Sequence, residues 1–409
     1  MTAICDAMVN DDDWSDLAQF HPMPEIDHQR LHSYRSNRLK NELVKADAAL
    51  CIMFNPISMR YAVNYRNYAL FQSHIPTTYL FYPQQGPVVA FGAYEPDPQG
   101  FELRHGRPVT YFDGGDVLVA AAEALADDVV NFLSEIGTDN RRVAVEYVTP
   151  AITQALERRG LEVIDGVMIS EHARVIKSAD EIACMRWSIA VAELGISKLK
   201  QAIKPGVSEL QLWALLNYTS LANNGDWHDG RMLASGPRIN PWLQEASPRK
   251  LESGDLVGFD TDMVGPMGYF ADISRTFHCG PAKPTLRQKQ LYRLAVEEIT
   301  FNMNLVKPGI GLREFQQLAW PVPEEFQANA YTCVAHAVGM CDEYPQIKHI
   351  FRMENPYDCQ LEAGMVMCIE SYIGAQGERD GVKLEQQVLV TDTGYELLTN
   401  YPFEPDLLE

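Results

Sequence analysis

The sequence is short of positive charge. Its 409 residues include 34 Lys and Arg against 55 Asp and Glu, which gives a formal net charge of −21 at pH 7, and the basic residues form no run. Because a groove for DNA or RNA needs clustered Lys and Arg to neutralise phosphates, we expect no nucleic-acid partner. The chain also lacks a stretch of about 18 consecutive apolar residues, which argues against a membrane-spanning helix.

Paired cysteines are absent as well. None of the eight cysteines forms a CxxC motif, which favours free thiols in a reducing cytoplasm over disulfides or a Cys-ligated zinc site. The opening segment, MTAICDAMVNDDDWSDLAQF, has neither the basic start nor the apolar centre of a signal peptide. We therefore expect a cytoplasmic protein.

Length and pattern predict two domains, because 409 residues exceed what one hydrophobic core usually serves. Residues 1–30 are polar and acidic, and we expect them to form an N-terminal arm. Residues 31–170 alternate between strand and helix patterns, which predicts an α/β domain. Residues 171–409 repeat a helix pair followed by strands, which predicts an α+β domain.

Acidic side chains gather in the segment GDLVGFDTDMVGPMGYFADISRT. A short apolar strand leads into Asp260 and Asp262, and after a Gly/Pro turn a second strand leads into Asp272. Alternate residues of a strand share a face, so Asp260 and Asp262 are predicted to point together, with Asp272 opposite them. Three clustered carboxylates are costly to bury without a cation. A metal ion supplies that charge, whereas the alternative is a neutralising Lys or Arg.

Three further polar residues lie in apolar strand patterns downstream. His336 lies in VAHAVG, Glu370 in MVMCIES and Glu385 in VKLEQQV. Taken singly, a hairpin Asp is usually solvated and a lone His is usually a satisfied core group. As a set, five carboxylates and one imidazole suit two bridged divalent ions of the iron, manganese or cobalt kind, with zinc as a further candidate.

These residues and their spacing resemble the creatinase, prolidase and methionine aminopeptidase superfamily, which has the pita-bread fold. The strings EIACMRWS, PGVSE and LEAGMVMCIE agree with it, and the resemblance covers about residues 175–402. It implies an α+β fold with a creatinase-like N-terminal α/β domain and a pita-bread catalytic domain. It also implies two metal ions bound by two Asp, one His and two Glu, and a homodimer.

Two departures separate the chain from the peptidases of that superfamily. Those enzymes carry a His shortly before the metal-binding strand, but here the window reads NPWLQEAS. They carry a second His after the metal-binding His, where this chain has Asp342 in HAVGMCDEYP. Both peptidase groups that assist a tetrahedral intermediate are therefore missing, which argues against amide hydrolysis.

The departures are similar to the DddP-type dimethylsulfoniopropionate lyases, a branch of the same superfamily. The strings FDTD, DISR, KLE and LASGPR followed by NPW carry this likeness, whereas Ala337 stands where Gly is usual. In those lyases six ligands hold two metals, and the Asp of the CDE segment is the base. The resemblance implies Asp342 as the base and, as ligands, Asp260, Asp262, Asp272, His336, Glu370 and Glu385.

Aromatic residues flank this predicted site. The faces of aromatic rings attract cationic sulfonium or ammonium groups, so we expect substrate contacts among them, although each could equally be a core or interface residue. The candidates are Trp227, Trp242, Tyr331 and Tyr344.

The predicted function is a metal-dependent lyase that cleaves dimethylsulfoniopropionate, or a similar onium carboxylate, to dimethyl sulfide and acrylate. Asp342 would remove the α proton, and β-elimination would follow. One alternative is an Xaa-Pro peptidase or creatinase-like C–N hydrolase that uses a metal-bound hydroxide. The other is a pita-bread module that binds a partner without catalysis.

Overall fold

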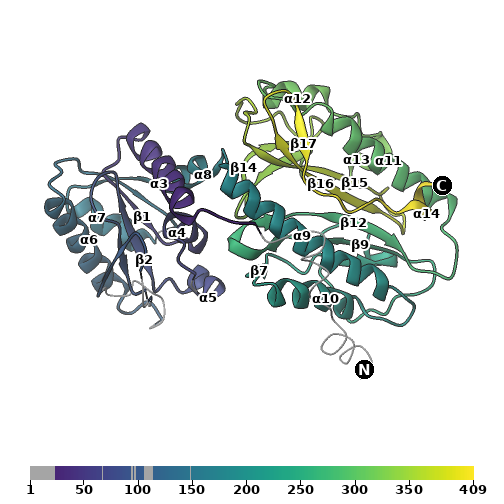
Figure 1. Cartoon of the computed structure of the whole chain (residues 1–409), viewed down its shortest axis with the longest axis horizontal. Helices are drawn as coiled ribbons and strands as arrows, with labels where there is room; N and C mark the ends of the chain where they lie inside the picture. Colours follow the sequence, from purple (N-terminus) through teal and green to yellow (C-terminus); the bar gives the residue numbers. More distant parts are fainter. Residues whose placement is uncertain (1–23, 67, 94, 96–97, 106–113, 148) are drawn as a thin grey trace. The chain divides into compact units, whose positions relative to one another are not determined.

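A computed structural model describes residues 24–66, 68–93, 95, 98–105, 114–147 and 149–409 of the chain (Figure 1). It divides into two compact units. The N-terminal unit comprises Asp27–Val175, and Ile176–Glu409 form most of the C-terminal unit. Residues 1–23 of the predicted acidic arm lie outside the described residues. The last residues assigned to that arm belong to a helix, α3 (His28–Lys45), which starts at the N-cap Asp27.

The N-terminal unit is built on one mixed sheet of six strands in the order β4-β3-β2-β1-β5-β6. Its core is apolar: α6 buries residues such as Leu125, Val129 and Phe132, and the Phe132 ring lies 5.4 Å from that of Phe81 on β2. The strands are β1 (Leu50–Met53), β2 (Tyr79–Pro83), β3 (Val89–Phe91), β4 (Glu102–Arg104), β5 (Arg142–Val145) and β6 (Glu162–Asp165). The helices after α3 are α4 (Pro56–Val63), α5 (Ala69–His74), α6 (Leu118–Glu135), α7 (Pro150–Arg158) and α8 (Val167–Arg174).

Helices of the C-terminal unit begin at well-defined caps. Ser178 and Glu181 form a capping box at the start of α9, and Ser208 and Gln211 form another at the start of α10. Such reciprocal bonds satisfy backbone N–H groups that the first helical turn leaves unpaired. The helices are α9 (Ala179–Ala202), α10 (Glu209–Ala222), α11 (Leu286–Met303), α12 (Leu312–Leu318), α13 (Glu324–Gln327) and α14 (Pro405–Leu408).

The sheets of the C-terminal unit lie between these helices, with α10 on one side and α11 and α12 on the other (Figure 1). Two small sheets have the orders β11-β10-β7 and β12-β9-β8, and a larger one has the order β14-β13-β15-β16-β17. The first seven strands of this unit are β7 (Trp227–His228), β8 (Leu233–Ser235), β9 (Leu256–Asp260), β10 (Met263–Val264), β11 (Phe270–Ala271), β12 (Ser274–His278) and β13 (Ala335–Val338). The others are β14 (Asp342–Ile347), β15 (Val366–Ile373), β16 (Val382–Val390) and β17 (Tyr395–Leu397).

The predicted succession of helix pair, strands, helix pair and strands is present in this unit, so its α+β class is confirmed. The seven cysteines among the described residues are free thiols. In that same part of the chain, no helix is both long enough and apolar enough to cross a bilayer.

Candidate metal centre

The hairpin around β9 brings three acids together. Asp260 is the last residue of β9 and faces Ser274 of β12, while Asp262 has a left-handed backbone with φ of 36°. The predicted strand therefore ends at Asp260. Asp262 lies in a turn whose left-handed backbone Asp tolerates better than most residues, and this turn orients the Asp262 carboxylate. One carboxylate oxygen each from Asp260, Asp262 and Asp272 still lies within 4.8 Å of the others.

The large sheet supplies the other three residues. In the hairpin of β15 and β16, Glu370 lies directly opposite Glu385, and their side chains share a face. His336 lies on the neighbouring strand β13, where a β-bulge follows it. Its Nε2 is 3.2 Å from Glu370 Oε1 and 3.7 Å from Asp272 Oδ2. The structure thus gathers all six predicted residues into one cluster.

Two members of the cluster were missed by the sequence analysis, Cys368 and Lys383. The Cys368 sulfur lies within 4.8 Å of ligand atoms of Asp272, His336 and Glu385. Both residues precede a cluster glutamate by two positions on the same strand, so the alternation of the hairpin could have found them.

Lys383 is fully buried and contacts three of the acids. Its Nζ lies 3.0 Å from Asp260 Oδ2, 2.6 Å from Glu370 Oε2 and 3.5 Å from Glu385 Oε2. Burial by itself would lower the pKa of Lys383, but these carboxylates raise it well above its ordinary value, so the ammonium is charged. The alternative of a neutralising lysine is therefore partly realised.

One ammonium does not satisfy the cluster. Among the described residues, Asp260 Oδ1, Asp272 Oδ1 and Glu385 Oε1 are buried and have no hydrogen-bond partner. Burial, followed by neighbouring carboxylates, raises the pKa of Asp272 and of Glu385 well above the ordinary range. Lys383 thus occupies one oxygen of Asp260 and of Glu385 and leaves the other oxygen of each to a further cation. The donor set, rich in oxygen with one imidazole, fits divalent metal ions.

Asp342 lies at the open side of the cluster, with 65% of its side-chain surface exposed. Its Oδ1 is 3.5 Å from Nδ1 of His336, whose Nε2 faces the buried acids. Burial alone would lower the pKa of His336, but Asp342 and Glu370 hold it well above its usual value. The predicted base is thus placed beside the cluster and open to solvent.

The four predicted aromatic contacts have different surroundings. The Tyr331 ring lies 4.6 Å below Lys383 Nζ, which ties it directly to the cluster. Trp227 is half-buried and donates its indole N–H to Asp229. The Trp242 ring stacks on Tyr372, with ring centroids 6.2 Å apart. The Tyr344 ring stacks on Tyr357, with centroids 5.2 Å apart.

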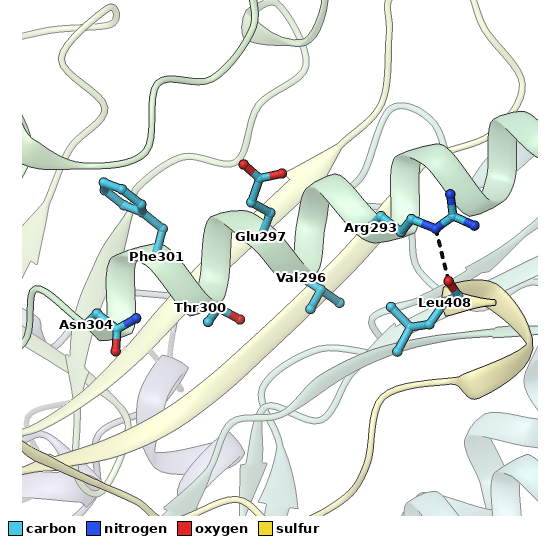
Figure 2. A pocket seen from close by; sticks show the side chains of 7 residues that line it. All are labelled: Arg293, Val296, Glu297, Thr300, Phe301, Asn304 and Leu408. Atoms are coloured by element: carbon cyan, nitrogen blue, oxygen red, sulfur yellow. Dashed lines mark hydrogen bonds between the residues drawn. The ribbon is translucent and has the colours of Figure 1, made fainter.

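Helix α11 separates the cluster from a surface cavity of about 490 Å³. Figure 2 shows residues of the outer face of α11 that line this cavity, with Arg293 bonded to the carbonyl oxygen of Leu408. None of the predicted site residues lines it. On the inner side of α11, Glu298 is buried and accepts a hydrogen bond of 2.6 Å from Ser371 Oγ, next to Glu370. The cavity is therefore not the site that the sequence predicts.

Glu298→Gln is expected to change how stability depends on pH. Burial raises the pKa of Glu298 to about 8, so the folded state keeps a proton that the unfolded state releases near the ordinary pKa of 4.5. Between these two values stability therefore falls as pH rises, and above about 8 it levels off. The melting temperature of the Gln variant should exceed that of the wild type increasingly from pH 5 to pH 8. A constant difference over this range would show that Glu298 is ionised.

The chain is similar to known proteins over most of its length. Metallopeptidase family M24 matches residues 183–392. The dimethylsulfoniopropionate lyase DddP of Roseovarius nubinhibens is 37% identical, over 94% of this chain and 89% of its own. The protein of the same name from Roseobacter denitrificans is 35% identical, over 92% of this chain and 87% of its own.

Solved structures of peptidases share the fold. An Xaa-Pro dipeptidase from Bacillus anthracis has a TM-score of 0.72 at 22% identity, covering 91% of this chain and 99% of its own. The prolidase of Pyrococcus horikoshii has a TM-score of 0.70 at 19% identity, and the match covers 90% of this chain and 99% of the prolidase. The predicted resemblance and the predicted fold, a creatinase-like α/β domain followed by a pita-bread domain, are confirmed. The chain belongs to metallopeptidase family M24, whose enzymes work with two divalent metal ions.

Proposed function

We propose that this protein is a metal-dependent lyase that cleaves dimethylsulfoniopropionate, or a similar onium carboxylate, to dimethyl sulfide and acrylate. The observation that carries the proposal is the carboxylate of Asp342 beside His336, at the open side of a cluster that fits metal ions. The names of the lyase relatives described above support the same reaction.

The six clustered residues would hold two divalent ions, with iron first and manganese, cobalt or zinc as further candidates. When bound, such ions supply positive charge that acidifies a C–H bond next to a carboxylate. The proposed ligands are Asp260, Asp262, Asp272, His336, Glu370 and Glu385.

Asp342 would carry out the proton transfer. Its carboxylate takes the α proton, the C–H electron pair forms the new C=C bond, and the C–S bond breaks with its pair on sulfur. The products are neutral dimethyl sulfide, acrylate and a protonated Asp342, which its exposure lets exchange with water.

The direct test uses metal-loaded protein with dimethylsulfoniopropionate, and gas chromatography of the headspace. We expect dimethyl sulfide and an equal amount of acrylate, with no proline released from Ala-Pro in a parallel assay. Proline release without dimethyl sulfide would overturn the lyase proposal in favour of an Xaa-Pro peptidase. A protein that binds metals but turns over neither substrate would favour the binding module.

Asp342→Asn is expected to keep the bound metals and to lower kcat by about two to four orders of magnitude, because the amide cannot accept the proton. The matched control is Glu354→Gln, which neutralises an exposed acid of the same unit. Sulfide release and metal content are measured on all three proteins. If Asp342→Asn retains the wild-type kcat, Asp342 is not the base.

Metal uptake by chelator-treated protein is expected to strengthen as pH rises. Burial and nearby carboxylates raise the pKa values of Asp262, Asp272 and Glu385, so ion binding has to expel protons from them. Each displaced proton makes the apparent affinity rise about tenfold per pH unit below these raised pKa values. Titration calorimetry with Mn²⁺ in buffers of different ionisation enthalpy counts those protons. Uptake without proton release would contradict the ligand assignment.

Two further expectations belong to this proposal, a homodimer and a cytoplasmic location. Light scattering of the purified full chain measures the mass that decides the first. Fractionation of the source cells decides the second.

A further inference from the structure

The segment that carries Trp227 runs alongside the acidic hairpin. In β7, Trp227 and His228 pair with Val264 and Met263 of β10. The pairing continues by one residue, because the backbone N–H of Asp229 donates to the carbonyl oxygen of Asp262 at 3.0 Å. Asp229 is thereby placed next to Asp262 of the metal-binding cluster.

Neighbouring side chains of this segment point to opposite sides, as expected for an extended chain. The His228 ring bonds the carbonyl oxygen of Thr261 through Nδ1 at 2.6 Å and packs edge-on against Trp213. Trp227 and Asp229 share the other side, where Trp227 Nε1 donates to Asp229 Oδ1 at 2.8 Å. This bond fixes the indole plane and the carboxylate relative to each other.

With two divalent ions bound, the charges within the metal-binding cluster balance without Asp229. The five clustered carboxylates carry −5, and two divalent ions with Lys383 carry +5, so the interior is neutral with His336 as an uncharged ligand. Asp342 and Asp229 are exposed and lie outside this balance. Both outer acids nevertheless border the cluster: the backbone N–H of Asp229 bonds the carbonyl oxygen of Asp262, and Asp342 Oδ1 lies 3.5 Å from Nδ1 of His336. Asp342 has a role as the base, whereas Asp229 has none in the reaction itself.

We propose that Asp229 and Trp227 form the recognition site for the cationic end of the substrate, a sulfonium or quaternary ammonium group. This inference rests on the proposed lyase function. An onium group has no N–H or O–H to donate, so it is bound by charge and by ring faces, and a carboxylate bonded to an indole offers both. The pair therefore selects an onium carboxylate over a neutral molecule of the same shape.

The test compares two inhibitors that differ in charge and hardly in shape: 3-(trimethylammonio)propanoate and 4,4-dimethylpentanoate. For Asp229→Asn, which keeps an oxygen for the Trp227 N–H, we expect KM for dimethylsulfoniopropionate and Ki for the ammonium compound to rise about tenfold. The Ki of 4,4-dimethylpentanoate and kcat should stay within about threefold of the wild type. Glu245→Gln, which removes an exposed charge paired with Arg231, is the control and should change none of these constants.

Equal weakening of both inhibitors would make Asp229 a structural residue and overturn the inference, as would unchanged constants for both.

Trp227 is tested in the same way. Trp227→Phe keeps a ring face and should lose less than about threefold in affinity for the ammonium compound, whereas Trp227→Leu should lose about tenfold.

Failure of the proposed lyase function is recognised separately, because wild-type protein would then release no dimethyl sulfide. Calorimetry of the two inhibitors with metal-loaded wild type and Asp229→Asn still decides the recognition site in that case. A preference of the wild type for the ammonium compound that disappears in the variant supports the inference. The absence of such a preference in the wild type overturns it.

Discussion

Five carboxyl groups of the C-terminal unit form overlapping groups in which ligand atoms lie within 4.8 Å of one another, and the remainder of the site is arranged around their mutual repulsion. Each buried, unpaired carboxylate costs several kcal/mol, which is comparable to the whole stability of a domain. The ammonium of Lys383 relieves part of that repulsion, and protons held at raised pKa values relieve more of it. Among the described residues, three buried oxygens of the cluster remain without a hydrogen-bond partner, and the proposed divalent ions would complete the compensation.

Local sequence patterns could predict the two hairpins, because alternation along a strand and the turn residues between strands are local signals. They brought Asp272 back towards Asp260 and assigned Glu370 and Glu385 to strands of the same site. They did not predict the left-handed backbone of Asp262, which depends on where β9 stops pairing. That end is set by the pairing of β9 with β8 and β12, which the pattern within β9 alone does not show.

Lys383 was missed for a different reason. Alternation along β16 puts Lys383 on the same face as Glu385, but its contacts with Asp260 and Glu370 exist only after three strands have come together. The aromatic residues show the same limit. The sequence places Trp227 and Tyr344 near the site, but only the fold shows that Trp227 bonds Asp229 while Tyr344 stacks on Tyr357.

The structural neighbours are peptidases, whereas the proposed reaction breaks a C–S bond, so one scaffold serves both kinds of chemistry. The hairpin of β15 and β16 shows where such change is allowed. Cys368, Glu370, Lys383 and Glu385 all project from one face of it, and a one-residue slip of either strand would turn the two site residues of that strand to the other face. An insertion or deletion of one residue within either strand would therefore remove site residues, whereas Asp342 and Trp227 lie on other strands and can change without disturbing this hairpin.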